Sequence, residues 1–287
     1  MMPTPRNDTI GTALRAAAAR LAHEPAARLE AELLLAEALG CERTTLHAWP
    51  ERTLPAGVRE RFEDLLARRA AGEPVAYLLG RREFYGLELV VTPATLIPRP
   101  ETELLVDEAL ARMPADARWT VADLGTGSGA VALAIARARP RCTVVATDAD
   151  PAALAVARAN AARLELANVR FVRGHWLAAL GRAALDMVVS NPPYVAEGDP
   201  HLCRGDPRFE PRHALAAGPD GLDALRAIIT GAPAVLAPDG WLLVEHGADQ
   251  RGAVLDLLAR TGFGETVTAD DLAGLPRVAG GRLQAAE

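Results

Sequence analysis

The chain has 287 residues and a formal net charge of −6, so no general positive field indicates nucleic-acid binding. All 31 basic residues are arginines, which excludes a Schiff-base lysine and the lysine-bearing phosphate loop. No apolar run approaches the roughly 18 residues of a membrane span, and residues 1–11 lack the pattern of a secretory signal. We therefore expect a soluble, cytoplasmic protein without a membrane partner.

The length suits one medium domain and one small domain, and half of the residues are hydrophobic, which is ample for a buried core. Cys41, Cys142 and Cys203 are too far apart to suggest a disulfide framework or a zinc site. The six histidines are also scattered. We predict no metal site.

Residues 1–74 are predicted to form a small helical bundle. The segments ALRAAAARLAHE, AARLEAELLLAEALG and VRERFEDLLARRAAG carry apolar residues at three- and four-residue spacing, which is typical of amphipathic helices. Pro25 can open the second helix, and Gly40 stands where a C-terminal cap is expected. Nothing in this segment indicates chemistry, so a structural role is one interpretation.

Residues 75–100 are predicted to form a β-hairpin linker, because VAYLLG and LELVVT flank the segment RREFYG. Pro100 and the acidic residues after it then suit the first turn of a helix. From residue 118 onward, short apolar strands alternate with helices, which predicts a mainly parallel sheet with helices on both faces. ETVTAD and RVAGGRL could add a final pair of strands. We assign residues 101–287 to this α/β domain.

A glycine-rich turn joins the first of these strands to a helix. Its glycines allow a tight turn and the close approach of a ligand to the backbone. The residues of the turn are Gly125, Thr126, Gly127, Ser128 and Gly129. Asp148 ends the next strand, 19 residues after Gly129, near the spacing at which a carboxylate accepts hydrogen bonds from both ribose hydroxyls. Asp150 is better suited to start the following helix at Pro151.

The glycine spacing separates two kinds of cofactor site. GTGSG departs from GxGxxG, which disfavours a pyrophosphate cradle and favours the amino-acid end of S-adenosylmethionine. Asp123 could meet the ammonium group of that cofactor or could simply orient the turn. Trp176 follows the third strand and could flank the adenine, although ordinary core packing also explains it. The sequence thus predicts a methyltransferase.

The acceptor site is predicted from a tetrapeptide after the fourth strand, where ligands bind beyond the carboxyl ends of parallel strands. It consists of Asn191, Pro192, Pro193 and Tyr194. The Asn191 side-chain oxygen and the Pro192 carbonyl can accept the two N–H groups of a planar amide, and the prolines hold both acceptors in place. Tyr194 supplies an aromatic face. We assign Asn191, Pro192 and Tyr194 to catalysis by positioning, and the whole tetrapeptide to substrate binding.

On these residues the chain resembles the release factor glutamine methyltransferases. The resemblance covers nearly the whole chain and includes AELLLAEALG, LIPRPETE, DLGTGSG, SNPPY, RFEP and LLVEHG. It implies a Rossmann-like class I S-adenosylmethionine methyltransferase domain with a small N-terminal helical domain that helps to dock the substrate. The implied reaction is methylation of the side-chain nitrogen (N5) of glutamine in the GGQ motif of class I peptide chain release factors.

By the same resemblance, the glycine turn, Asp148, Trp176 and Asn191 bind the methyl donor. The sequence departs from the family pattern at His175, because relatives commonly carry an acidic residue there that suits the adenine amino group. A neutral imidazole nitrogen could accept the same hydrogen bond, or His175 could face solvent.

Further residues near the predicted crevice have open roles. Arg99, Glu101 and Glu103 could close the pocket, but helix capping explains the two acids equally well. Arg208, Phe209 and Glu210 could form a lid, because residues 195–222 resemble a long loop. Glu245 and His246 end the fifth strand, where we favour a structural role.

Two other functions share parts of this pattern. A nucleic-acid adenine N6-methyltransferase would use the same tetrapeptide on another planar nitrogen, but the acidic balance and the absence of a basic target-recognition segment disfavour it. A non-catalytic binding module could keep the cofactor fold as a scaffold. The intact segment from Asn191 to Tyr194 disfavours that interpretation.

Overall fold

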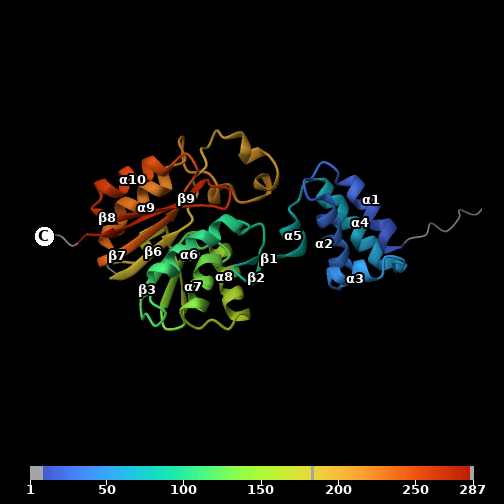
Figure 1. Cartoon of the computed structure of the whole chain (residues 1–287), viewed down its shortest axis with the longest axis horizontal. Coiled ribbons are helices and arrows are strands. Elements are labelled where there is room, and N and C mark those ends of the chain that lie inside the picture. The colour runs from blue at the N-terminus through green and yellow to red at the C-terminus, as the bar shows by residue number, and fades with distance from the viewer. Residues whose placement is uncertain (1–8, 182–183, 285–287) are drawn as a thin grey trace, which may run out of the picture. The chain divides into compact units, whose positions relative to one another are not determined.

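The computed structural model describes residues 9–181 and 184–284. Residues 1–8, which hold most of the segment examined for a secretory signal, lie outside the described residues. Contacts within the chain divide it into two compact units, Met1–Gly80 and Arg81–Glu287 (Figure 1). Within the described residues, no helix is both long and apolar enough to cross a membrane.

The first unit is helical, as predicted. Its helices are α1 (Ile10–Arg20), α2 (Ala27–Leu39), α3 (Arg43–Ala48), α4 (Ala56–Ala70) and α5 (Val75–Leu79). Leu14, Leu34, Phe62 and Leu66 lie in one buried cluster, to which α1, α2 and α4 all contribute apolar side chains. Gly40 caps α2 in the left-handed conformation with φ 66°, as expected, whereas the short helices α3 and α5 were not predicted.

The first strand of the predicted hairpin was wrong. VAYLLG forms helix α5, which begins after Pro74 and ends at Gly80 with φ 68°. The hairpin lies further on, with β1 (Arg81–Phe84) antiparallel to β2 (Leu87–Val90). Tyr85 and Gly86 join the strands and both have positive φ, which is the backbone twist that a two-residue hairpin turn requires. A five-residue apolar run carries no periodicity that separates helix from strand.

The second unit is an α/β sheet with the predicted alternation. Its remaining elements are α6 (Glu103–Arg112), β3 (Thr120–Leu124), α7 (Ala130–Ala138), β4 (Thr143–Asp148), α8 (Pro151–Arg163), β5 (Val169–Arg173), β6 (Leu185–Ser190), α9 (Asp223–Gly231), β7 (Leu236–Glu245), α10 (Arg251–Arg260), β8 (Phe263–Asp270) and β9 (Pro276–Leu283). The strand order is β5-β4-β3-β6-β7-β9-β8, and β9 is antiparallel to both of its neighbours. The predicted final strand pair is therefore confirmed.

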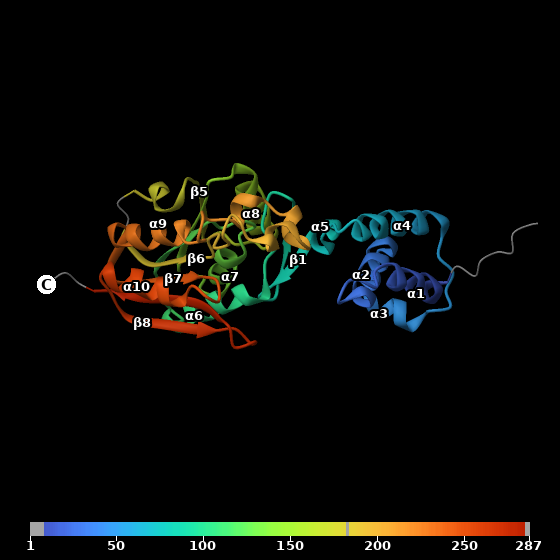
Figure 2. The same ribbon diagram turned by 90° about the horizontal axis from the view of Figure 1, so that it is seen from above.

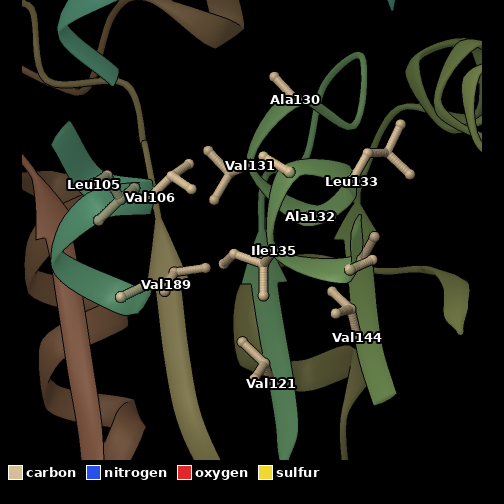
Figure 3. Close-up of a cluster of buried hydrophobic side chains, with 14 of the residues drawn as sticks. Leu105, Val106, Val121, Ala130, Val131, Ala132, Leu133, Ile135, Val144 and Val189 are labelled. Carbon is tan, nitrogen blue, oxygen red and sulfur yellow. The ribbon is translucent and has the colours of Figure 1, made fainter. Parts of the chain in front are cut away.

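Helices cover both faces of this sheet (Figure 2). Adjacent residues of β3 belong to different cores, because side chains of a strand alternate between its two faces: Val121 packs with α6 and α7, and Ala122 packs with α9 and α10. Figure 3 shows Val131 and Ile135 of α7 pointing toward Val106 of α6 and Val189 of β6. The strand order changes direction between β3 and β6, so a ligand crevice is expected at their carboxyl ends.

A buried asparagine ties the hairpin to the glycine turn. Asn160 on α8 has no exposed surface, and its Oδ1 accepts a hydrogen bond of 2.7 Å from the Val90 N–H. Its Nδ2 donates to the carbonyls of Val90 and Ser128, each at 2.9 Å. One side chain thus fixes β2 and the turn against α8, although 70 residues separate it from Val90 along the chain.

Replacing this asparagine is expected to destabilise the fold. In Asn160→Ala, buried polar groups of Val90 and Ser128 lose their partner, so the free energy of unfolding should fall by about 2–4 kcal/mol. Urea unfolding followed by tryptophan fluorescence measures the change. The exposed neighbour variant Arg158→Ala should change it by less than about 0.5 kcal/mol; equal losses in the two variants would contradict the role given to Asn160.

Candidate functional site

The two predicted loops begin side by side at one edge of the sheet. Leu124, the last residue of β3, is the register partner of Ser190, the last residue of β6. The Ser190 hydroxyl donates a 2.8 Å hydrogen bond to the Leu124 carbonyl, and Ser190 is fully buried. Residues 125–129 and the tetrapeptide from Asn191 therefore leave the sheet as neighbours.

The glycine turn has the conformation that its sequence predicts. Gly125, Gly127 and Gly129 have φ values of 70°, 57° and 89°, a region that residues with a Cβ atom rarely adopt. Thr126 and Ser128 have buried side chains, and the Thr126 hydroxyl donates to Asp123 at 2.6 Å. The polar side chains of the turn thus face the protein, and its glycine backbone faces the crevice.

Asp123 of β3 is hydrogen-bonded to the glycine turn. Its Oδ2 accepts hydrogen bonds from the Thr126 hydroxyl and from the Ala132 N–H at 3.1 Å. Burial raises the pKa of Asp123 to about 6, against these two hydrogen bonds, which lower it. Of the two roles expected for Asp123, these contacts support the orientation of the turn.

Asp148, the last residue of β4, is also hydrogen-bonded to the glycine turn. Its Oδ2 accepts a hydrogen bond from the Gly127 N–H at 2.9 Å, and its Oδ1 accepts one from the Asp150 N–H at 2.9 Å. Asp150 caps α8 by accepting from the Ala152 N–H at 2.8 Å, so its predicted role as a helix start is confirmed. Of these two acids, Asp148 is the one whose carboxylate contacts the glycine turn.

Trp176 lies against the glycine turn. A Cβ atom at Gly125 would lie only 3.1 Å from the Trp176 ring, so the absence of a side chain lets the indole approach. The ring also packs on the core cluster of α9 and α10. Its position therefore suits both suggested roles, core packing and contact with an adenine. His175 stands edge-on to it, with ring centroids 5.3 Å apart.

These residues line one cavity of about 420 Å³. Its wall includes most of the predicted cofactor residues. The lining residues include Gly125, Gly127, Asp148, His175, Trp176, Asn191 and Pro193. A smaller cavity of about 50 Å³ shares Gly125, Gly127 and Asn191, and adds Thr126, Ser128, Asp123, Arg99 and Thr102. The pocket has the size and the mixed polar and apolar lining of a small-molecule site, with a carboxylate where a diol could bind.

The asparagine of the tetrapeptide has a defined orientation. Asn191 Nδ2 donates to the Thr102 hydroxyl at 2.9 Å, so its Oδ1 points away from Thr102. Pro192 is buried, and Pro193 lines the cavity. The Tyr194 hydroxyl donates to Glu245 Oε1 at 3.1 Å, and the Tyr194 carbonyl accepts from Gln250 Nε2 at 3.0 Å. The wall of the larger cavity includes neither Pro192 nor Tyr194.

Glu245 is a buried carboxyl behind the tetrapeptide. It is 1% exposed, and burial raises its pKa to about 7, although the hydroxyls of Thr102 and Tyr194 lower it. Burial and the Glu245 charge likewise raise the pKa of Tyr194. Sequence reasoning missed Thr102 and left Glu245 as structural, because neither stands in a motif with a recognisable chemical spacing.

One of the residues proposed as a lid, Glu210, makes an ion pair with Arg99. Glu210 has a fully buried side chain, pairs with Arg99, and accepts a hydrogen bond of 3.3 Å from the Ile97 N–H. Burial raises the pKa of Glu210. Arg208 stacks on the Phe209 ring at 4.7 Å. The pair fastens the segment before α6 to the segment after the tetrapeptide.

The two acids after Arg99 differ in their contacts. Glu103 Oε1 accepts from the Tyr85 N–H at 2.8 Å and so anchors the hairpin turn, whereas Glu101 is exposed.

Among residues 9–181 and 184–284, no group of three or more His, Cys, Asp or Glu side chains is arranged to hold a metal ion.

Comparison with known proteins gives matches over both units. The family model of the PrmC N-terminal domain matches residues 12–80, and that of the methyltransferase small domain matches residues 101–203. The release factor glutamine methyltransferase of Pseudomonas aeruginosa is 52% identical over 90% of this chain and 94% of its own length. That of Burkholderia pseudomallei is 50% identical over 93% and 96%.

A solved structure supports the fold. The 16S rRNA N2 G1207 methyltransferase of T. thermophilus, solved in complex with AdoMet and guanosine, aligns with a TM-score of 0.54 at 21% identity. The alignment covers 71% of this chain and 50% of that one. At this identity the similarity is one of fold.

The buried carboxyl of Asp123 predicts a pH effect on stability. Its pKa rises from 3.8 to about 6 on folding, so its contribution to stability is fully present below pH 4 and is lost as the pH rises through 6. From pH 4 to pH 7, the wild type should therefore lose roughly 2–3 kcal/mol relative to Asp123→Asn. Urea unfolding at several pH values measures this difference, with Asp239→Asn at an exposed position as the charge control. Parallel pH profiles for wild type and Asp123→Asn would contradict the assignment.

Proposed function

This chain belongs to the release factor glutamine methyltransferase family, and we propose that it methylates the side-chain amide nitrogen (N5) of glutamine in the GGQ motif of class I peptide chain release factors. One observation carries the proposal. Asn191, the residue suited to hold an amide, lines the same cavity as Gly125, Gly127 and Asp148, the residues suited to hold a methyl donor.

The cavity residues fit S-adenosylmethionine, which when bound supplies a methyl group on a positively charged sulfur. Asp148 would accept from the ribose hydroxyls, because its carboxylate keeps free lone pairs beside those used by Gly127 and Asp150. Trp176 would lie against the adenine, and His175 offers a ring nitrogen nearby. The backbone at Gly125 and Gly127 would receive the amino-acid part, with Thr126, Ser128 and Gly129 shaping the turn.

The glutamine amide would be held between two acceptors. Asn191 Oδ1 is available because Nδ2 is occupied by Thr102, and the Pro192 carbonyl can take the second N–H. The amide lone pair is delocalised into its carbonyl, so holding both N–H groups favours the geometry in which the nitrogen can react. Pro193 and Tyr194 complete this grip, and the proton becomes acidic once the nitrogen is alkylated.

The helical segment, residues 1–74, would dock the body of the release factor, with residues 75–100 as the linker to the methyltransferase domain, residues 101–287. A release factor substrate would place the protein in the cytoplasm. The chain has a net charge of −6, which suits a protein substrate better than a nucleic acid.

The two alternative functions have less support. A nucleic-acid adenine N6-methyltransferase would share the tetrapeptide, but the relatives at 50–52% identity act by name on release factor glutamine. A non-catalytic module would have no need for a side-chain amide oriented by Thr102 at the wall of the cavity.

The modified atom gives the first test. A class I release factor incubated with the protein and S-adenosylmethionine should gain one methyl group on the GGQ glutamine, located by tandem mass spectrometry. A release factor with that glutamine changed to alanine should gain none. Transfer only to DNA or RNA supplied in parallel would favour the adenine alternative.

The role of the asparagine gives the second test. Asn191→Ala should lower kcat/KM for the release factor at least about 30-fold, which corresponds to about 2 kcal/mol of transition-state stabilisation. Initial rates with radiolabelled methyl donor measure the loss, and an unchanged melting temperature shows that the fold is intact. Wild-type rates in this variant would exclude Asn191 as an acceptor of the amide.

A further inference from the structure

We propose that Glu245 and Thr102 are positioning residues that keep the Asn191 amide oriented with its oxygen toward the glutamine. This inference rests on the proposed function, because the orientation matters only if an amide is bound there. The proposed network joins two hydrogen-bonded pairs behind the cavity: Asn191 donates to Thr102, and Tyr194 donates to Glu245.

The direction of each hydrogen bond follows from the proton that each group can give. Thr102 Oγ1 accepts from Asn191 Nδ2, so the hydroxyl proton of Thr102 needs another acceptor. Thr102 is 4% exposed, which leaves little water to serve, and its hydroxyl lies close enough to the Glu245 carboxylate to lower the pKa of that group. Oε2 of Glu245 is buried and has no hydrogen-bond partner among the described residues, so it is available for this proton.

The ionised carboxylate of Glu245 can only accept hydrogen bonds, and this property fixes the direction of each hydrogen bond in the network. It takes the hydroxyl protons of Thr102 and Tyr194, so Thr102 must accept from Asn191, and Asn191 must present Oδ1 to the cavity. A protonated Glu245 can instead donate to Thr102. The Thr102 proton is then free to bond Asn191 Oδ1, which turns Nδ2 toward the cavity, where it would meet the N–H of the substrate.

Charged and titratable groups from several elements surround Glu245. Arg277 on β9 favours the ionised form, and Glu101 before α6 disfavours it. Tyr194 faces the carboxylate from the tetrapeptide, and buried His246 is the next residue of the chain. Burial dominates and raises the pKa of Glu245 to about 7, so its ionisation changes within the range in which the enzyme can be assayed.

The kinetic test uses the pH dependence of methyl transfer to a release factor. For the wild type, kcat should rise about tenfold from pH 6 to pH 8, because the ionised fraction of a group with a pKa of about 7 rises by that factor. Glu245→Gln has one acceptor oxygen and a donating NH2 group where the carboxylate has two acceptor oxygens, so its kcat should be about tenfold lower at pH 8 and independent of pH. Thr102→Val should behave in the same way, and Thr102→Ser should keep the wild-type profile.

Two further variants separate positioning from general damage. The double variant Glu245→Gln/Thr102→Val should lose no more than either single variant, because both changes break one chain of hydrogen bonds. Glu108→Gln on α6, which removes the charge that pairs with Arg112, should keep the pH profile. Multiplied losses in the double variant, or a wild-type pH profile in Glu245→Gln, would overturn the inference.

A spectroscopic test needs neither methyl donor nor substrate. The chain has four asparagines, so side-chain amide resonances of protein labelled with ¹⁵N-asparagine can be assigned by comparison with Asn191→Ala. The Asn191 resonances should titrate with a midpoint near pH 7 in the wild type and stay constant in Glu245→Gln. If they titrate while release factors are not methylated, the proposed function fails and the network stands. If they do not titrate although release factors are methylated, the network fails alone.

Discussion

The site depends on the register between two neighbouring parallel strands. Because Leu124 and Ser190 are register partners at the ends of β3 and β6, residues 125–129 and the tetrapeptide after Ser190 leave the sheet at the same place. The Ser190 hydroxyl fixes this register by donating to the Leu124 carbonyl. A shift of one residue would turn every side chain of β6 to the opposite face and separate the two halves of the cavity.

Around this edge, buried polar side chains do the positioning. Asn160 holds the glycine turn from α8, Asp123 holds it from the sheet, and Thr102 orients Asn191. Each of these side chains is at least nine-tenths buried, so each hydrogen bond is formed where water cannot replace it. The groups that would face the ligands are therefore arranged before either ligand binds, which is the condition for catalysis by positioning.

Much of this arrangement could be predicted from local patterns. The alternation of strands and helices predicted the sheet, the glycine spacing predicted the turn at Gly125, and Asp150 before Pro151 predicted a helix start. The segment 75–80 was misassigned because a short apolar run suits helix and strand alike. Thr102, Asn160 and Ser190 were missed for another reason: their partners lie 89, 32 and 66 residues away, and no local pattern records such contacts.

The central claim is that methyl donor and glutamine meet where β3 and β6 end. A crystal structure of the protein with S-adenosylhomocysteine and a release factor tests it most directly. The sulfur should lie within the cavity beside Gly125 and Asp148. The GGQ glutamine nitrogen should be hydrogen-bonded to Asn191 Oδ1 and should face that sulfur. A glutamine bound on another face of the domain, or a donor product outside this cavity, would contradict it.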